Sequence, residues 1–187
     1  MGETRLPRMV TPLVAMLAQQ SAHFALARPA LEQVFGAVEL ESPLYNFDKT
    51  AYYDEEMGQH LKRLFYTFKP LADPARLADW KLRTNALELE LKTRIVALAD
   101  TVTCPMRPIN LDPGYITGAK LVLASTKDFA HRLYLRDGIF AEITMGFRGS
   151  GWVSHDFTFP DFRSGMYDAF LKKARDWHLE KVKKAEN

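Results

Sequence analysis

The sequence predicts a single α+β domain over residues 1–187, built on a mixed or antiparallel sheet. A length of 187 residues and an apolar content of 47% fit one globular domain with a buried core. Up to residue 111 the patterns follow the order strand, helix, strand, strand, helix, strand, which is that of a ferredoxin-like unit. An added hairpin and a closing C-terminal helix complete the predicted fold.

The N-terminal elements are predicted from short apolar and alternating runs. Residues 12–18 form an apolar run typical of a buried strand. A helix is expected over 27–36, with Pro29 in its first turn. Residues 37–42 alternate apolar and acidic side chains, as a half-buried strand does, and the aromatic-rich run 62–69 favours another strand.

The longest predicted helix begins at Asp73, an N-cap residue followed by Pro74 at the first helical position. Apolar residues and one threonine recur at spacings of three and four along it: Leu77, Trp80, Thr84, Leu87, Leu91, Ile95 and Leu98. A strand is predicted over 107–111. The segment Asp112-Pro113-Gly114-Tyr115 is expected to close that strand as a type II turn.

Asp137-Gly138 between alternating apolar residues predicts a β-hairpin, for which two registers compete. A two-residue loop pairs Arg136 with Ile139. A three-residue loop over 136–138 pairs Leu135 with Ile139. This register is preferred, because Tyr134 then faces Phe140 and Arg132 faces Glu142.

In the preferred register, Arg132 and Glu142 share one face, and an ion pair between them is favoured over a catalytic role. His131 is expected on the opposite, mainly aliphatic face. Downstream, a strand is predicted to end at Pro160. A final helix over 164–184 is expected to turn Met166, Phe170, Ala174 and Trp177 toward the core.

Composition excludes several classes of protein. With 25 basic and 23 acidic residues the net charge is +2, which argues against nucleic acid as a partner. The single cysteine, Cys104, excludes an internal disulfide or Cys-rich zinc site and fits a cytoplasmic protein. No apolar run is long enough for a membrane span, and no Gly-x-x-x-x-Gly-Lys-Ser/Thr phosphate loop is present.

Polar side chains gather along the segment from Asn110 to Glu142, beside predicted turns and strand ends. Lysine and arginine can hold phosphate or carboxylate, and a carboxylate can act as an acid or base or hold Mg²⁺. The catalytic candidates are Asp112, Lys120 and Glu142. The ligand-binding candidates are Lys120, Lys127, Asp128, His131, Arg132 and Arg63.

A second polar segment, YYDEEMGQHLKR, sets Glu56, His60 and Arg63 near helical spacing, so a shared helix face is expected there. An ordinary solvated face with an internal ion pair is preferred over a site. Glu56 and His60 are too few ligands for a metal, and no metal site is predicted.

The stretches RPINLDPGYITGAKLVLASTKDFAHRLYL, DGIFAEIT, FDKTAYYDEEMGQHLKR, ADWKLRTNALE and FTFPDFR together resemble the bacterial family catalogued as domain of unknown function 4416. The resemblance covers nearly the whole chain and implies no reaction. The positions that match its motifs are Tyr52, Tyr53, Glu56, Met57, Gly58, Lys62, Arg63, Asn85, Glu88, Asn110, Asp112, Gly114, Tyr115, Lys120, Lys127, Asp128, His131, Arg132, Glu142, Asp161 and Arg163.

The function expected from these residues is binding of a small anionic ligand, with a phosphate or carboxylate group and including nucleotides, in a cleft of basic and acidic side chains. This hypothesis requires Asp112, Lys120, Arg132 and Glu142 to meet in one cleft. The alternative is a non-catalytic protein-interaction module with an exposed apolar patch. Whether the protein is an enzyme, its cofactor (Mg²⁺ being one option) and its oligomeric state stay open.

Overall fold

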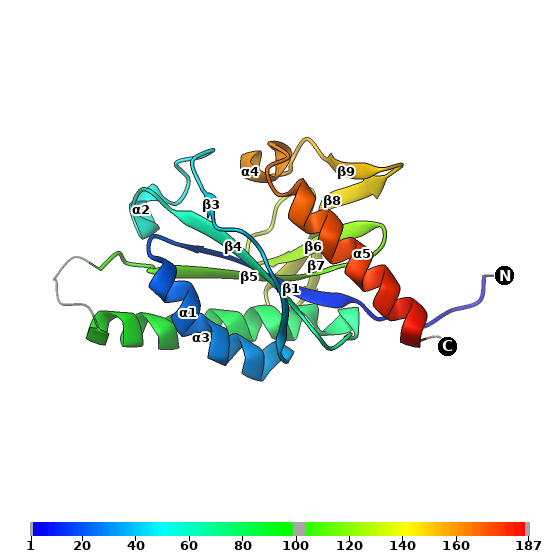
Figure 1. The fold of residues 1–187 in the computed structure, drawn as a ribbon, viewed down its shortest axis with the longest axis horizontal. Helices are drawn as coiled ribbons and strands as arrows, with labels where there is room; N and C mark the ends of the chain where they lie inside the picture. Colours follow the sequence, from blue (N-terminus) through cyan, green and yellow to red (C-terminus); the bar gives the residue numbers. More distant parts are fainter. Residues whose placement is uncertain (1, 99–103, 186–187) are drawn as a thin grey trace.

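One antiparallel sheet runs through the molecule, and helices cover both of its faces (Figure 1). The computed structural model describes residues 2–98 and 104–185. In this part of the chain the main strand order is β2-β4-β1-β5-β6-β8-β7, with β3 beside β4 and β9 beside β8. The strands are β1 Thr11–Ala18, β2 Val38–Glu41, β3 Tyr45–Asn46, β4 Lys62–Phe68, β5 Ile109–Ile116, β6 Lys120–Ser125, β7 Leu133–Arg136, β8 Ile139–Arg148 and β9 Gly151–Ser154.

The helices lie in two layers on opposite sides of the sheet (Figure 1). Helices α1 (Ser21–Phe35) and α3 (Leu77–Leu98, preceded by a 3-10 turn over Pro74–Arg76) pack on one face. Helices α4 (Pro160–Arg163) and α5 (Asp168–Ala185) cover the other, and the short α2 spans Asp54–Met57.

Strand β1 is buried along its whole length because both of its faces are covered. Val14 and Met16 belong to the core under α1 and α3, whereas Leu13 and Ala15 belong to the core under α5. A strand covered on both faces needs a continuous apolar run, so the run at 12–18 predicted this strand correctly.

The order β2-β4-β1-β5, with α1 and α3 on one face, is the predicted ferredoxin-like arrangement. The α+β class is confirmed, and of the two sheet types allowed by the sequence the antiparallel one is found. Strands β6, β8 and β7 extend the sheet beyond this unit, and α5 closes its second face.

Helix α1 begins at Ser21, earlier than predicted, so Pro29 lies inside the helix and not in its first turn. A proline inside a helix removes one backbone hydrogen bond. Here Phe24, Ala27, Leu31 and Phe35 recur at helical spacing and are all buried, so packing on the sheet outweighs the cost of the proline.

The predicted turn at residues 112–115 is wrong, because β5 continues straight through it to Ile116. Pro113 lies opposite Val14 of β1, and Gly114 lies between Leu13 and Leu123. Gly114 is required by close approach and not by turn geometry: a Cβ atom there would lie 2.1 Å from the carbonyl oxygen of Val122.

The hairpin combines the two predicted registers. Its loop has two residues, Asp137 and Gly138, both with positive φ, and Arg136 pairs with Ile139, so the preferred three-residue loop is wrong. A bulge at Leu135 then shifts the register, and Tyr134 faces Phe140 as predicted.

His131 is not on the opposite face from Glu142, as had been predicted. It precedes β7 in a turn closed by the Arg132 N–H and the Phe129 carbonyl, where strand alternation does not apply. Its Nε2 lies 3.3 Å from Glu142 Oε2.

Two C-terminal predictions are also corrected. The strand predicted to end at Pro160 ends at Ser154, and Pro160 instead opens α4. In α5 the buried positions include Phe170 and Ala174, as expected, but the next is His178 and not Trp177.

Candidate functional site

A pocket of about 190 Å³ opens where β5 and β6 separate within the sheet. The two strands pair only from Gly114–Leu123 to Ile116–Leu121. The next pair would join Pro113 to Ala124. The Thr117 N–H donates to the Lys120 carbonyl. In an antiparallel pair every second residue points its backbone nitrogen at the same neighbouring strand, so the nitrogen of Pro113, like that of Thr117, points toward β6. Proline has no N–H to donate, so the ladder ends there and the strands diverge.

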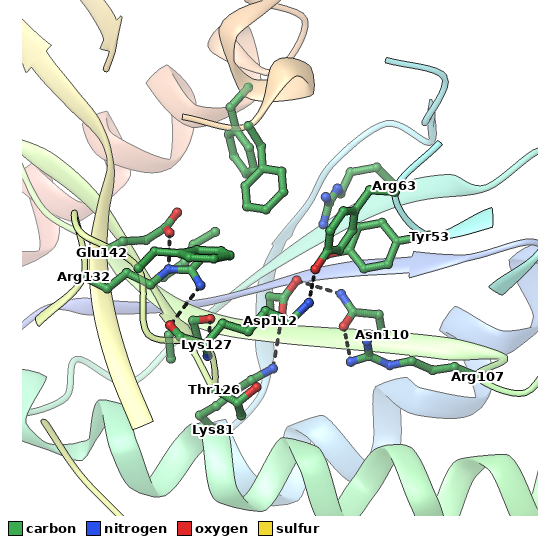
Figure 2. Close-up of a pocket in the computed structure, with 17 residues that line it drawn as sticks. Tyr53, Arg63, Lys81, Arg107, Asn110, Asp112, Thr126, Lys127, Arg132 and Glu142 are labelled. Carbon is green, nitrogen blue, oxygen red and sulfur yellow. Dashed lines mark hydrogen bonds and ion pairs between the residues drawn. The ribbon is translucent and has the colours of Figure 1, made fainter. Parts of the chain in front are cut away.

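The pocket gathers side chains that are far apart in the sequence (Figure 2). They come from the segments before α2 and before β5, from β4, α3, β5, β6 and β8, from the loop between β6 and β7, and from the start of α4. The lining residues are Tyr52, Tyr53, Arg63, Lys81, Arg107, Asn110, Asp112, Leu123, Ala124, Ser125, Thr126, Lys127, Phe129, Arg132, Glu142, Phe159 and Phe162.

Asp112 is held at the centre of the pocket by two donors (Figure 2). Lys81 Nζ donates to its Oδ1 over 3.1 Å, and Asn110 Nδ2 donates to its Oδ2 over 2.7 Å. Burial alone would raise the pKa of Asp112, but the charges of Lys81 and Arg63 and these hydrogen bonds hold it below its usual range. Asp112 is therefore an ionised carboxylate with both oxygens engaged.

Arg107 extends this network toward α3. Its Nη2 donates to the side-chain oxygen of Asn110, and its Nε donates to Glu88 Oε2 over 2.9 Å. Glu88 also accepts the Leu111 N–H over 2.7 Å. Burial raises the pKa of Glu88 although Lys81 and Arg107 oppose this effect. The network fixes β5 against α3 and sets one wall of the pocket.

Arg63 forms a buried ion pair with Asp161 behind the aromatic side of the pocket. Their side chains are 5% and 0% exposed, and Arg63 Nη2 lies 3.2 Å from Asp161 Oδ2, which also accepts from the Tyr167 hydroxyl over 3.0 Å. Burial disfavours the charged guanidinium, but Asp161 holds the pKa of Arg63 above its ordinary value. Arg63 Nε and Asp161 Oδ1 have no hydrogen-bond partner among the described residues.

Glu142 and Arg132 meet at the opposite wall, as predicted, and both are buried. Arg132 Nε donates to Glu142 Oε2 over 2.8 Å, and Thr144 donates to Oε1 over 3.0 Å. Arg132 Nη1 also donates to the Lys127 carbonyl over 3.1 Å. The pair therefore positions the loop that carries Lys127.

Lys127 differs from the other basic residues of the pocket. Arg63, Lys81, Arg107 and Arg132 each pair with a carboxylate, but Lys127 forms no ion pair within residues 2–98 and 104–185. Its Nζ instead contacts the hydroxyl of Tyr52, which lies in the segment before α2, so the side chain reaches from the β6 side of the pocket to the α2 side. Lys127 is exposed, so water and the Tyr52 ring surround its charge, and no carboxylate of the described residues balances it.

The protonated hydroxyl of Tyr53 adds a donor to the same region. Burial, with a contribution from Asp112, raises the pKa of Tyr53 well above its ordinary value. The phenol therefore keeps its proton at neutral pH.

Five of the predicted site residues line the pocket: Arg63, Asp112, Lys127, Arg132 and Glu142. Lys120 does not, because it begins β6 and pairs with Gly146 at the far end of that strand. The predicted four-residue cleft is therefore wrong: Asp112, Arg132 and Glu142 line one pocket without Lys120, and Lys127 is the lysine that lines it with them. Any anion site there rests on this different set of residues. Asp128 is exposed outside the lining, and His131 reaches Glu142 without lining the pocket.

Sequence reasoning missed Lys81 and Arg107. Lys81 lies four residues after Leu77 and seven before Glu88, so two charged residues interrupt the buried side of α3. A charged pair one heptad apart on a core-facing helix was the signal available. Tyr52, Tyr53 and Asn110 line the pocket and stood among the family-motif positions.

The shared helix face expected for Glu56, His60 and Arg63 does not form. Helix α2 ends at Met57, His60 has a positive φ, and Arg63 lies in β4. Glu56 instead lies 3.7 Å from Arg107.

In residues 2–98 and 104–185, no group of three or more His, Cys, Asp or Glu side chains is placed to hold a metal ion. No helix in those ranges combines the length and apolar character needed to cross a membrane.

Fold and site together define an α+β protein with a charged, aromatic-lined pocket in a split antiparallel sheet. The chain belongs to the family described as Domain of unknown function (DUF4416), whose model matches residues 8–178. No curated protein and no solved structure gives a match.

Proposed function

We propose that the pocket binds a small anionic ligand through a phosphate or carboxylate group. The observation that carries this proposal is Lys127, the lining cation with no carboxylate partner among the described residues. A bound anion supplies that partner, and because Lys127 is exposed and screened by water the ion pair contributes about 1 kcal/mol.

Arg63 supports the same assignment. It lines the pocket, it is almost fully buried, and its Nε donor is free among the described residues. The Nε atom is buried from solvent, so Arg63 contributes positive charge beside the pocket and not a donor that a ligand reaches directly. The hydroxyl of Tyr53 is a further donor.

The volume favours a ligand smaller than a nucleotide. Sites for drug-sized molecules measure about 300–1,000 Å³, whereas this pocket measures about 190 Å³. Within the range of ligands expected from the sequence, small carboxylates and phosphorylated metabolites are thus preferred over nucleotides.

Thermal unfolding of the full chain tests the proposal. Inorganic phosphate, small carboxylates, phosphorylated metabolites and nucleotides are added in turn, each with and without Mg²⁺. A ligand at 100 times its Kd stabilises the folded state by about 2.7 kcal/mol and raises Tm with concentration. Absence of a shift with every anion refutes the proposal.

A second candidate, a protein-interaction module, is favoured by the free edge of the sheet. Leu133 is 73% exposed and Tyr134 62% exposed on β7, which ends the main strand order. An open apolar edge strand can pair with another chain. Replacing Leu133 with Lys should abolish such an association in sedimentation velocity; an unchanged complex, or none with wild type, contradicts this candidate.

A further inference from the structure

Aromatic side chains surround the mouth of the pocket and are incompletely buried. Tyr52, in the segment before α2, is 50% exposed, and Phe129, in the loop between β6 and β7, is 48% exposed. Phe159 also lines the pocket, and its ring centroid lies 6.3 Å from that of Tyr52. Aromatic rings contribute most when their faces are covered, so these half-exposed rings leave an apolar surface that a ligand can cover.

The pocket volume matches a single ring with one charged substituent. An apolar cavity of roughly 150 Å³ in a protein holds benzene. The present pocket, at about 190 Å³, has room for one ring and an anionic group.

The cationic and aromatic groups lie together. Lys127 Nζ is 4.5 Å from the centre of the Tyr52 ring, and Arg132 lies over Phe129 at 4.7 Å. The ends of one short ligand can therefore contact both an ammonium group and aromatic faces. A small anion without a ring would pair with Lys127 and leave these aromatic rings half exposed.

We propose that the ligand is an aromatic or heteroaromatic acid with one ring. Its carboxylate or phosphate group meets Lys127, and its ring lies against Tyr52 and Phe129. This inference rests on the proposed anion-binding function and adds the chemistry of the uncharged part of the ligand.

Calorimetry of the full chain with four probes tests the inference. Benzoate and cyclohexanecarboxylate carry the same charge on rings of nearly the same size, but only benzoate is planar and aromatic. Phenyl phosphate and inorganic phosphate distinguish the two anionic groups. The better of the two aromatic acids should bind about two- to tenfold more tightly than its ring-free or saturated counterpart.

The outcomes separate this inference from the function on which it rests. Equal affinities for the two ring carboxylates, together with equal affinities for the two phosphates, overturn the aromatic-acid assignment and leave anion binding intact. Failure of all four probes to bind overturns both.

The variant Phe129→Leu locates the ring. Leucine keeps an apolar side chain but removes the aromatic face, so the preference for benzoate over cyclohexanecarboxylate should fall by at least half. The matched control is Tyr134→Leu, which removes an exposed ring on β7 outside the pocket and should keep the full preference. Unchanged phosphate affinity in Phe129→Leu shows that the loop is intact. Full aromatic preference in that variant contradicts the placement at the mouth.

Discussion

The buried pair of Arg63 and Asp161 allows the sharpest test of what holds the pocket together. Asp161→Asn removes the charge of the carboxylate while keeping its shape and an acceptor for Tyr167. Arg63 then keeps its charge, because a guanidinium does not lose its proton at accessible pH. Both side chains are at most 5% exposed, so water cannot solvate the remaining charge.

The expected cost follows from this burial. Removing one partner of a buried ion pair destabilises a protein by about 3–5 kcal/mol, because an uncompensated charge stays inside. Arg63 lies over the rings of Phe47, Phe65 and Phe162 at 5.1–5.8 Å, and these contacts offset part of the cost. We therefore expect a loss near the lower end of that range.

Urea unfolding followed by circular dichroism measures this loss. The double variant Arg63→Met, Asp161→Asn removes both charges and sets a flexible apolar side chain among the rings. It should recover about 1–3 kcal/mol relative to Asp161→Asn alone. Stability of Asp161→Asn within about 0.5 kcal/mol of wild type, the range of ordinary surface substitutions, would refute the reasoning.

Two further predictions concern the fold. Gly114→Ala should lower the free energy of unfolding by about 1–3 kcal/mol or more, because the new Cβ meets the Val122 carbonyl oxygen at 2.1 Å. In the same denaturation assay, Gly151→Ala should change this free energy by less than about 0.5 kcal/mol, because its Cβ meets no atom within 4 Å. Burial lowers the pKa of His178 below 6.5, so the unfolded chain binds a proton that the folded chain resists, and stability should fall as the pH drops below about 6.5. His178→Gln should lose less stability than wild type between pH 7 and pH 5; equal losses contradict this assignment.

Elements with strong local patterns could be predicted from the sequence. The apolar run of β1 and the helical stripe from Leu77 to Ile95 are buried as expected, whereas Leu98, the last predicted member of that stripe, is 73% exposed. Their periodicity reflects the faces they present to the core, which is a local property of the chain. The ferredoxin-like order followed from these elements and their sequence.

The structural role of Pro113 and Gly114 could not be predicted from the neighbouring sequence. A Pro-Gly pair favours a turn when its neighbours are unknown. In the structure both residues serve the contact with β6: Gly114 allows its close approach, and Pro113 ends its pairing. Both effects depend on a strand that comes later in the chain.

The site was predicted in part for a similar reason. Lys120 and Lys127 are close in sequence but lie toward opposite ends of β6: Lys120 begins this strand and Lys127 follows its end. The six residues of the strand span roughly 17–20 Å. Only the register of the sheet shows which end meets Asp112. Lys81 was missed because charged residues of a helix are ordinarily placed in water.

The most direct test compares Lys127→Gln with Lys120→Gln in titration calorimetry with the anion that most raises Tm. Both changes remove one lysine charge, and both side chains lie at or beyond an end of β6. Anion binding through the pocket predicts that Lys127→Gln weakens affinity by about fivefold and that Lys120→Gln leaves it within about twofold. Equal affinity losses in the two variants, or a loss confined to Lys120→Gln, would contradict the assignment of anion binding to this pocket.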